Sequence, residues 1–320
     1  MSNRDAQIKN FLKNQLLKEF KIEKIADDAS FRRYFRIFLN DLLPPMVLMD
    51  APPEQECIKN FVSICQFLRD KDINVPEIKG ISYEEGFILM TDLGKDSFMD
   101  VFLVSNNFGL YELALDELFK MQKSINDLDI EAYDGSKLLA ESSLFHDWYL
   151  SQNKKISFDL KMLNALYSKI IEKNLNQKKV FVHRDFHSRN LLLSQEGNLG
   201  GIDFQDAVYG PITYDLVSLL KDAYVELDEN FVLDQLIRYW QKLRSEFDDI
   251  KDFDLFFIDF EWMAIQRHLK ILGIFSRLAI RDAKHKYLKD IPLVEKYLLA
   301  MIGNYPELKY FADLIEEKVA

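Results

Sequence analysis

Several short motifs that identify common enzyme classes are missing from this chain of 320 residues. None of its 11 glycines is followed by another glycine two positions later, so the dinucleotide-binding motif G-x-G-x-x-G is absent. The phosphate loop G-x-x-x-x-G-K-[ST] is absent too, as are H-E-x-x-H, C-x-x-C and G-x-S-x-G. The commonest signals of zinc proteases, redox proteins and serine hydrolases are therefore missing.

Cysteine, net positive charge and long apolar runs are scarce as well. Cys57 and Cys65 are the two cysteines, and the helical pattern around them predicts a separation of ~12 Å, beyond disulfide reach. This favours a reducing, cytoplasmic location. The net charge of -11 disfavours nucleic acid and anionic lipid as partners, and no run of ~20 apolar residues could span a membrane. The sequence leaves the oligomeric state open.

Two parts of different texture predict an α+β fold. The chain is 48% hydrophobic and 29% charged, the balance of a globular protein. Residues 21–92 alternate like strands around one helix, whereas helical spacing dominates from about residue 97. We therefore expect an N-terminal lobe at 1–92, a hinge at 93–96 and a helical C-terminal lobe at 97–320.

The periodicity also predicts individual elements. A helix near 4–19 precedes strands at 46–50, 78–83 and 87–91 and a helix at 54–69. The expected helices of the second part lie near 97–104, 108–124, 136–150, 157–176, 213–224, 229–245, 252–281, 291–302 and 306–318.

One segment, residues 180–206, interrupts the helical part with short apolar runs and a cluster of polar residues. Its strands at 191–194 and 199–204 flank a turn, which predicts a hairpin. If Gln195 pairs with Asn198, then Asn190 faces Asp203 at ~5 Å. An amide oxygen and a carboxylate at that spacing can share Mg²⁺, which takes one or two protein carboxylates together with water and phosphate.

Asp185 follows the apolar run 180–182 and precedes Asn190 by five residues. We expect it to reach the same space and to accept a proton. Aspartate is a weak base at neutral pH, which suits phosphoryl transfer, where positioning and late proton acceptance matter more than base strength.

The string His183-Arg184-Asp185-Phe186-His187-Ser188-Arg189-Asn190, with Ile202-Asp203-Phe204 after it, resembles the catalytic and metal-binding loops of aminoglycoside phosphotransferase-like kinases. Those enzymes have the bilobal protein-kinase fold, which implies that the lobe at 1–92 is a nucleotide-binding lobe, that the lobe at 97–320 carries the catalytic loop and the substrate site, and that the reaction takes place in the cleft between the lobes. The segments at 28–36, 49–53, 202–224 and 266–275 are more specifically similar to bacterial kinases of cell-wall amino sugars. The resemblance implies ATP- and Mg²⁺-dependent phosphorylation of the anomeric hydroxyl of N-acetylmuramate or N-acetylglucosamine, as part of peptidoglycan recycling.

By position, the resemblance makes Asp185 the catalytic base and Asn190 and Asp203 the magnesium ligands. It also implies that the segment 87–94 binds adenine, with Met90, Asp92 and Leu93 as the contact residues.

Two features depart from the wider kinase pattern. No glycine-rich loop covers the phosphates, and Val47-Leu48-Met49-Asp50 stands where the third strand usually presents a lysine. Ser30, Arg32 and Arg36 share one strand face by the period of two. We expect Arg32 to be the main phosphate clamp, ahead of Arg36 and Arg33, because a guanidinium can bind phosphate through two hydrogen bonds.

The remaining candidates each have a common alternative. His183 and Asp215 are expected to support the catalytic loop rather than to transfer protons. Polar residues on a long helix usually face water, and exposed loop residues are usually solvated. Gln205 and Asp206 directly follow Asp203 and could reach the substrate, whereas only the resemblance makes substrate ligands of Gln266, Arg267 and His268.

Three classes of function remain open. The first is a small-molecule kinase that acts on an amino sugar or on another small alcohol of the aminoglycoside, choline or homoserine type. The second is a metal-dependent hydrolase that uses His183, Asp185, His187 and Asp203. The third is a pseudokinase that binds nucleotide without turnover, an alternative raised by the missing lysine.

Overall fold

The computed structural model describes residues 3–16, 19–25, 31–39, 43–124, 128–194 and 197–318. The chain divides into two compact units. The first comprises residues 1–100 and 190–206, and the second comprises 101–189 and 207–320. This partition differs from the expected lobes, because it assigns the hairpin at 190–206 to the N-terminal unit. The lobe boundaries at 92–96 stay a prediction.

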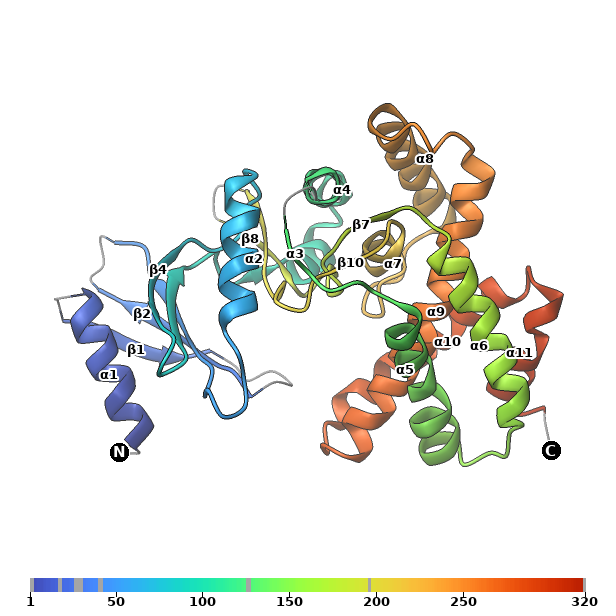
Figure 1. Cartoon of the computed structure of the whole chain (residues 1–320), viewed down its shortest axis with the longest axis horizontal. Coiled ribbons are helices and arrows are strands. Elements are labelled where there is room, and N and C mark those ends of the chain that lie inside the picture. The colour runs from blue at the N-terminus through green and yellow to red at the C-terminus, as the bar shows by residue number, and fades with distance from the viewer. Residues whose placement is uncertain are drawn as a thin grey trace. The chain divides into compact units, whose positions relative to one another are not determined.

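The first unit is built on a five-stranded antiparallel sheet (Figure 1). Helix α1 (Asn3–Leu16) packs Ile8, Phe11 and Leu12 against apolar residues from β2, β3 and β5, which form the core of this unit. We expected this sheet to carry only the helix within residues 21–92, and α1 packs against it in addition. In spatial order the strands are β1 (Lys21–Lys24), β2 (Arg33–Phe38), β3 (Met46–Asp50), β5 (Phe87–Thr91) and β4 (Ile78–Ser82).

A smaller sheet in the same unit joins β6 (Asp96–Ser97), β8 (Leu191–Leu193) and β9 (Leu199–Gly201). Asn74 ties this sheet to the segment after helix α2 (Lys59–Asp70), because its side chain donates to Leu199 O at 2.8 Å and its carbonyl accepts from Gly201 N at 2.9 Å. Phe61 of α2 packs on Phe204, with ring centroids 4.9 Å apart.

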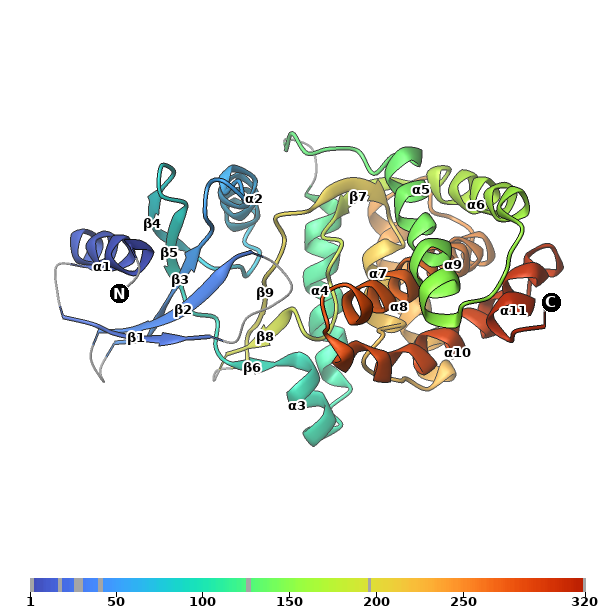
Figure 2. The same ribbon diagram turned by 90° about the horizontal axis from the view of Figure 1, so that it is seen from below.

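The second unit is mainly helical and is organised around the long helix α9 (Phe253–Ile280) (Figures 1 and 2). Strands β7 (Lys179–Val182) and β10 (Val208–Pro211) pair in a two-stranded sheet. Along the chain, β7 comes before the hairpin region and β10 comes after it. Its other elements are α3 (Phe98–Ser105), which begins in the first unit, α4 (Gly109–Lys123), α5 (Gly135–Leu144), the π-helix η2 (Phe145–Lys154), α6 (Leu160–Leu175), α7 (Tyr214–Leu220), α8 (Glu229–Glu246), η3 (His285–Asp290), α10 (Ile291–Ile302), η4 (Pro306–Leu308) and α11 (Lys309–Ile315).

Most expected elements are present, and three details of the expectation are wrong. Cys57 lies outside α2, although both cysteines are free as expected. Helix α5 ends at Leu144 and continues as a π-helix, and α7 ends at Leu220 rather than near residue 224. Within the described residues, no helix combines the length and the apolar content that crossing a membrane requires.

Asp50, at the end of β3, is a fully buried carboxylate held by two arginines. Arg33, its partner in the β2–β3 register, and Arg4 of α1 both form ion pairs with it, the latter at 2.6 Å. The third strand therefore presents a neutralised carboxylate where the wider kinase pattern has a lysine.

The double substitution of Arg4 and Arg33 by alanine should destabilise the protein by about 3–5 kcal/mol, since it leaves a buried charge unpaired. Each single substitution should cost about 1.5–3 kcal/mol, because the other arginine still pairs with Asp50. Urea unfolding of the wild type and of all variants measures these differences in the free energy of unfolding. Asp50→Asn, added to the double variant, should restore part of the lost stability. A double variant as stable as the wild type would contradict this assignment.

Candidate active site

The segment after β7 is held in place by Asp215 at the start of α7. The Asp215 carboxylate accepts hydrogen bonds from His183 N at 2.6 Å and from Arg184 N at 3.0 Å. Arg184 has a positive φ of 73°, a conformation that costs a non-glycine residue free energy unless its surroundings enforce it. The two amide hydrogen bonds to Asp215 therefore fix the turn that leads into Asp185.

His183 is fully buried in this turn, where its Nδ1 atom accepts a hydrogen bond from Asp185 N at 3.3 Å. Its ring packs against Phe186 at 5.7 Å. Farther along, Asp222 accepts from Ser188 N at 3.0 Å. The loop is thus held mainly through its backbone.

The electrostatic surroundings of Asp185 favour its charged form. Burial acts to raise the pKa of its carboxyl, but Lys270, His187, Arg267 and His183 together lower the pKa below its ordinary value. Asp185 is therefore ionised at neutral pH and able to accept a proton.

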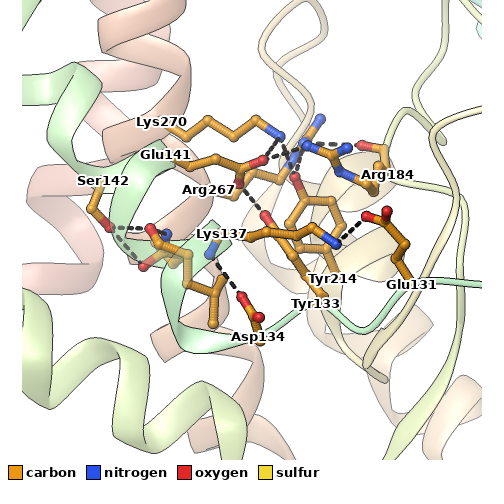
Figure 3. A network of polar contacts seen from close by, with 12 residues as sticks. Glu131, Tyr133, Asp134, Lys137, Glu141, Ser142, Arg184, Tyr214, Arg267 and Lys270 are labelled. Atoms are coloured by element: carbon orange, nitrogen blue, oxygen red, sulfur yellow. Dashed lines mark hydrogen bonds and ion pairs between the residues drawn. The ribbon is translucent and has the colours of Figure 1, made fainter.

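A group of charged residues from three elements lies in the same unit, and we call it the Glu141 cluster: Glu141, Arg184, Arg267 and Lys270, with Tyr133 and Tyr214 (Figure 3). Glu141 of α5 accepts from Arg184 at 2.5 Å and pairs with Lys270 of α9 at 3.0 Å. Tyr133 also donates to it. Tyr214 accepts from Lys270 at 2.8 Å and from Arg267 at 3.3 Å.

The three α9 candidates are all buried, so the common alternative of exposure to water is wrong for them. Gln266 donates to Leu138 O at 2.9 Å and accepts from Ser142 Oγ at 3.0 Å, which joins α9 to α5. His268 lies 3.1 Å from Lys221 O through Nε2, and burial is the main reason that its pKa falls to about 3. These two side chains serve helix packing, whereas Arg267 reaches toward the Asp185 loop.

In the first unit, the hairpin brings Asn190 and Asp203 to adjacent positions in a register that differs from the expected one. Leu191 pairs with Gly201, and Ile202 N donates to Asn190 O at 3.0 Å. Asn190 therefore faces Ile202, and the predicted pairing with Asp203 is off by one residue. The turn residues Gln195 and Glu196, on which that prediction depended, lie outside the described residues.

Asp203 has a positive φ of 69°, and its side chain is oriented by a neighbour. Gln205 Nε2 donates to Asp203 Oδ1 at 2.8 Å and lies 3.4 Å from Asp206 Oδ2. Asn190 and Asp203 offer only oxygen ligands, which is the donor chemistry that Mg²⁺ prefers. The described residues contain no group of three or more His, Cys, Asp or Glu suited to hold a metal ion, the kind of cluster that the hydrolase alternative requires.

Arg32 lies between two carboxylates of the first unit. It donates to Glu56 at 3.2 Å, and its guanidinium is 3.6 Å from Asp203. Burial acts to lower the pKa of Arg32, but Tyr34, Glu56 and Asp203 more than offset it and the pKa is raised.

Arg36 is bound elsewhere in the same unit. It donates to both carboxylate oxygens of Asp92, at 2.5 and 3.2 Å, and to Gly94 O at 3.1 Å. This interaction fixes the segment at 92–94, which the sequence predicts to contact adenine. Ser30 lies outside the described residues.

Sequence reasoning missed Glu141, Tyr214 and Lys270. Lys270 lies three residues after Arg267 on one helix, so their shared helix face was a usable signal. Glu141 and Tyr214 come from distant segments, and no local pattern indicated that they meet.

Comparison with known proteins shows which family this chain is similar to. The family model described as "Phosphotransferase enzyme family" matches residues 21–248. A curated relative from Neisseria meningitidis serogroup B, named N-acetylmuramate/N-acetylglucosamine kinase, is 38% identical over 325 residues, covering 99% of this chain and 96% of its own. One of the same name from Pseudomonas aeruginosa is 40% identical over 301 residues, covering 91% and 86%.

Solved structures show the same fold at low sequence identity. Choline kinase LicA from Streptococcus pneumoniae matches with a TM-score of 0.65 and 15% identity, over 93% of this chain and all of its own. The gentamicin complex of APH(2")-IIa matches with a TM-score of 0.62 and 17% identity, over 92% and 97%. The expected α+β, kinase-like fold is confirmed.

The protonation of Asp215 should make the stability of the protein depend on pH. Burial raises the pKa of this carboxyl from 3.8 to about 7, although His183 N, Arg267 and Arg184 N oppose the shift. Between these values the folded chain keeps a proton that the unfolded chain has lost. The contribution of Asp215 to stability therefore falls as pH rises through that interval.

Asp215→Asn removes this titration. The free energy of unfolding of the wild type, relative to that of the variant, should fall between about pH 4 and 7 and then level off. Urea unfolding across this pH range measures the difference, and a constant difference would contradict the assignment.

Proposed function

We propose that this chain, which belongs to the phosphotransferase enzyme family, is an ATP-dependent kinase of the anomeric hydroxyl of N-acetylmuramate and N-acetylglucosamine. The names of relatives that are 38% and 40% identical over most of the chain support the substrate. The observation that carries the chemistry is Asp185, an ionised carboxylate on a loop fixed by Asp215. A cytoplasmic location, where ATP is available, belongs to the same proposal.

In this reaction the anomeric oxygen attacks the γ-phosphorus of ATP. The bond between that phosphorus and the β–γ bridging oxygen breaks, ADP leaves with the bond's electron pair, and the hydroxyl proton passes to Asp185. The transition state is loose, so most of the acceleration comes from holding the hydroxyl in line and from charge stabilisation. A carboxylate of lowered pKa is sufficient for this late proton transfer.

Asn190 and Asp203 would hold Mg²⁺ through their side-chain oxygens, and Gln205 would keep the Asp203 carboxylate oriented. When bound, the ion would supply positive charge to the phosphate oxygens of the nucleotide. The adenine would bind along the segment at 90–93, which the Arg36–Asp92 pair holds in place.

A coupled ADP-release assay with Mg-ATP tests this function on both amino sugars, with an aminoglycoside, choline and homoserine as comparison alcohols. Sugar-dependent ADP release with a phosphorus NMR signal of a sugar 1-phosphate is expected. Asp185→Asn should lower kcat by about 10²–10⁴, because it removes the proton acceptor while preserving shape. Asp248→Asn, at an exposed carboxylate of the same unit, is the matched control.

Turnover of choline or homoserine in preference to both sugars would show that the proposed substrate is wrong. ADP release without any alcohol would favour a hydrolase. Nucleotide binding without turnover would indicate a pseudokinase. An Asp185→Asn variant with the circular dichroism spectrum and the turnover of the wild type would contradict the role of Asp185.

Arg32 is proposed to bind the nucleotide phosphates in place of the missing lysine. Arg32→Ala should raise the KM for ATP at least tenfold and leave the KM for the sugar within about twofold, since loss of a charge-assisted hydrogen bond costs about 1.5–3 kcal/mol. Arg33→Ala is the control, because Arg33 pairs with Asp50 instead. An unchanged KM for ATP in Arg32→Ala would exclude this role.

A further inference from the structure

Arg267, in the middle of α9, is a buried cation with weak hydrogen bonds. Its side chain is among the buried charged residues, with 5% exposure. Nη1 lies 3.4 Å from Arg184 O and 3.3 Å from the Tyr214 hydroxyl, two neutral oxygens at long distances. Nε is buried and has no hydrogen-bond partner. No described carboxylate forms an ion pair with this guanidinium.

The neighbouring cations differ from Arg267 because they share a carboxylate. Arg184 and Lys270 both contact the same oxygen of Glu141, at 2.5 and 3.0 Å (Figure 3). Glu141 thus serves two cations, and the third cation of the cluster, Arg267, has no direct anion.

Three other carboxylates influence Arg267 through their charge, but each has another role. Asp215 accepts hydrogen bonds from two backbone amides, and Asp222 accepts hydrogen bonds from Ser188 N and Tyr224 N. Asp185 is the proposed base. Burial acts to lower the pKa of Arg267, but Tyr214, Asp185 and Asp222 keep it raised. The guanidinium is therefore charged and still has donors available to an anion.

A buried charged donor without an acceptor costs free energy, and buried polar groups in native proteins are nearly always satisfied. A guanidinium presents a planar fork of donors that fits the two oxygens of a carboxylate. Arg267 therefore has the chemistry of an anion-binding residue.

Its position relative to Asp185 indicates which anion. Arg267 reaches the carbonyl of Arg184, the residue directly before the base, so an anion bound here lies close to the reacting hydroxyl. N-acetylmuramate differs from N-acetylglucosamine by a lactyl ether on C3, and one ring carbon separates C3 from the anomeric C1. The lactyl carboxylate is thus attached on the part of the ring next to the reacting carbon.

We propose that Arg267 binds the lactyl carboxylate of N-acetylmuramate and sets the preference of the enzyme for this acidic sugar over N-acetylglucosamine. The inference rests on the proposed function, since it concerns the same reaction. A guanidinium that instead contacted the transferred phosphoryl group, or that only supported the loop, would serve both sugars equally. The two sugars therefore separate these roles within one assay.

The experiment compares kcat/KM for the two sugars in the wild type, Arg267→Gln, Arg267→Lys and Arg277→Gln. Arg267→Gln should lower kcat/KM for N-acetylmuramate about 10- to 100-fold more than kcat/KM for N-acetylglucosamine, and the extra loss should lie mainly in KM. Arg267→Lys should be intermediate, because it keeps the charge and loses the fork.

Arg277 is the matched control. It lies on the same helix about 15 Å farther along the axis, and its Nε is also buried without a partner. Arg277→Gln should leave both sugars unchanged.

An equal loss for both sugars in Arg267→Gln, or no loss for N-acetylmuramate, would overturn the proposal while leaving the kinase function intact. A wild type that phosphorylates neither sugar would overturn both. If Arg267→Gln fails to fold, the test uses Arg267→Lys and measures the affinity of each sugar by calorimetry. An unchanged ratio of the two affinities contradicts the assignment. A selective loss of N-acetylmuramate binding supports it.

Discussion

The arrangement of charged residues around Asp185 depends on Glu141, a buried carboxylate that two cations share. It binds Arg184 in the Asp185 loop and Lys270 on α9, and it accepts a hydrogen bond from Tyr133. Burial acts to raise the pKa of Glu141, yet Lys270, Arg184 and the Tyr133 bond together lower it. Without this charge, Arg184, Arg267 and Lys270 would repel one another in a region of low dielectric constant. Glu141 therefore allows a concentration of positive charge near Asp185.

That concentration of charge has opposite effects on two parts of the proposed reaction. It lowers the pKa of Asp185, which makes this residue a weaker base. It also favours any anion that approaches, whether a phosphoryl group or a substrate carboxylate. Phosphoryl transfer tolerates the first effect, because proton transfer is late in a loose transition state. The arrangement therefore favours the binding of anions at the expense of base strength, which suits an acidic sugar better than a cationic alcohol.

The sequence predicted the parts of the site that are encoded in one continuous string. Asp185, Asn190 and Asp203 lie within 19 residues, and their types and spacing carried the chemistry. The hairpin register was wrong by one residue because it depended on which turn residues form the loop, a choice that local propensity does not determine. The prediction of magnesium binding survives this error, since Asn190 and Asp203 stay at adjacent positions of the hairpin.

Tertiary contacts explain what could not be predicted. The run Gln266-Arg267-His268 has the composition of a solvated helix face, yet α5, the catalytic loop and Lys221 bury all of it. Glu141 lies 43 residues before Arg184 in a helix of ordinary composition. A buried ion pair between such segments depends on how the helices pack, which periodicity cannot specify.

Because the third strand presents Asp50 in place of a lysine, the proposed phosphate contact has to come from another cation. Asp50 already binds Arg4 and Arg33, and Asp92 binds Arg36, so these arginines are held by carboxylates away from Asp203. Arg32 differs, because one of its two carboxylates is Asp203, the proposed magnesium ligand. In protein kinases the lysine on the third strand forms an ion pair with a glutamate of a neighbouring helix. A cation held by Asp203 would instead link the proposed phosphate contact to the metal contact, because Arg32 and a bound Mg²⁺ would share one carboxylate.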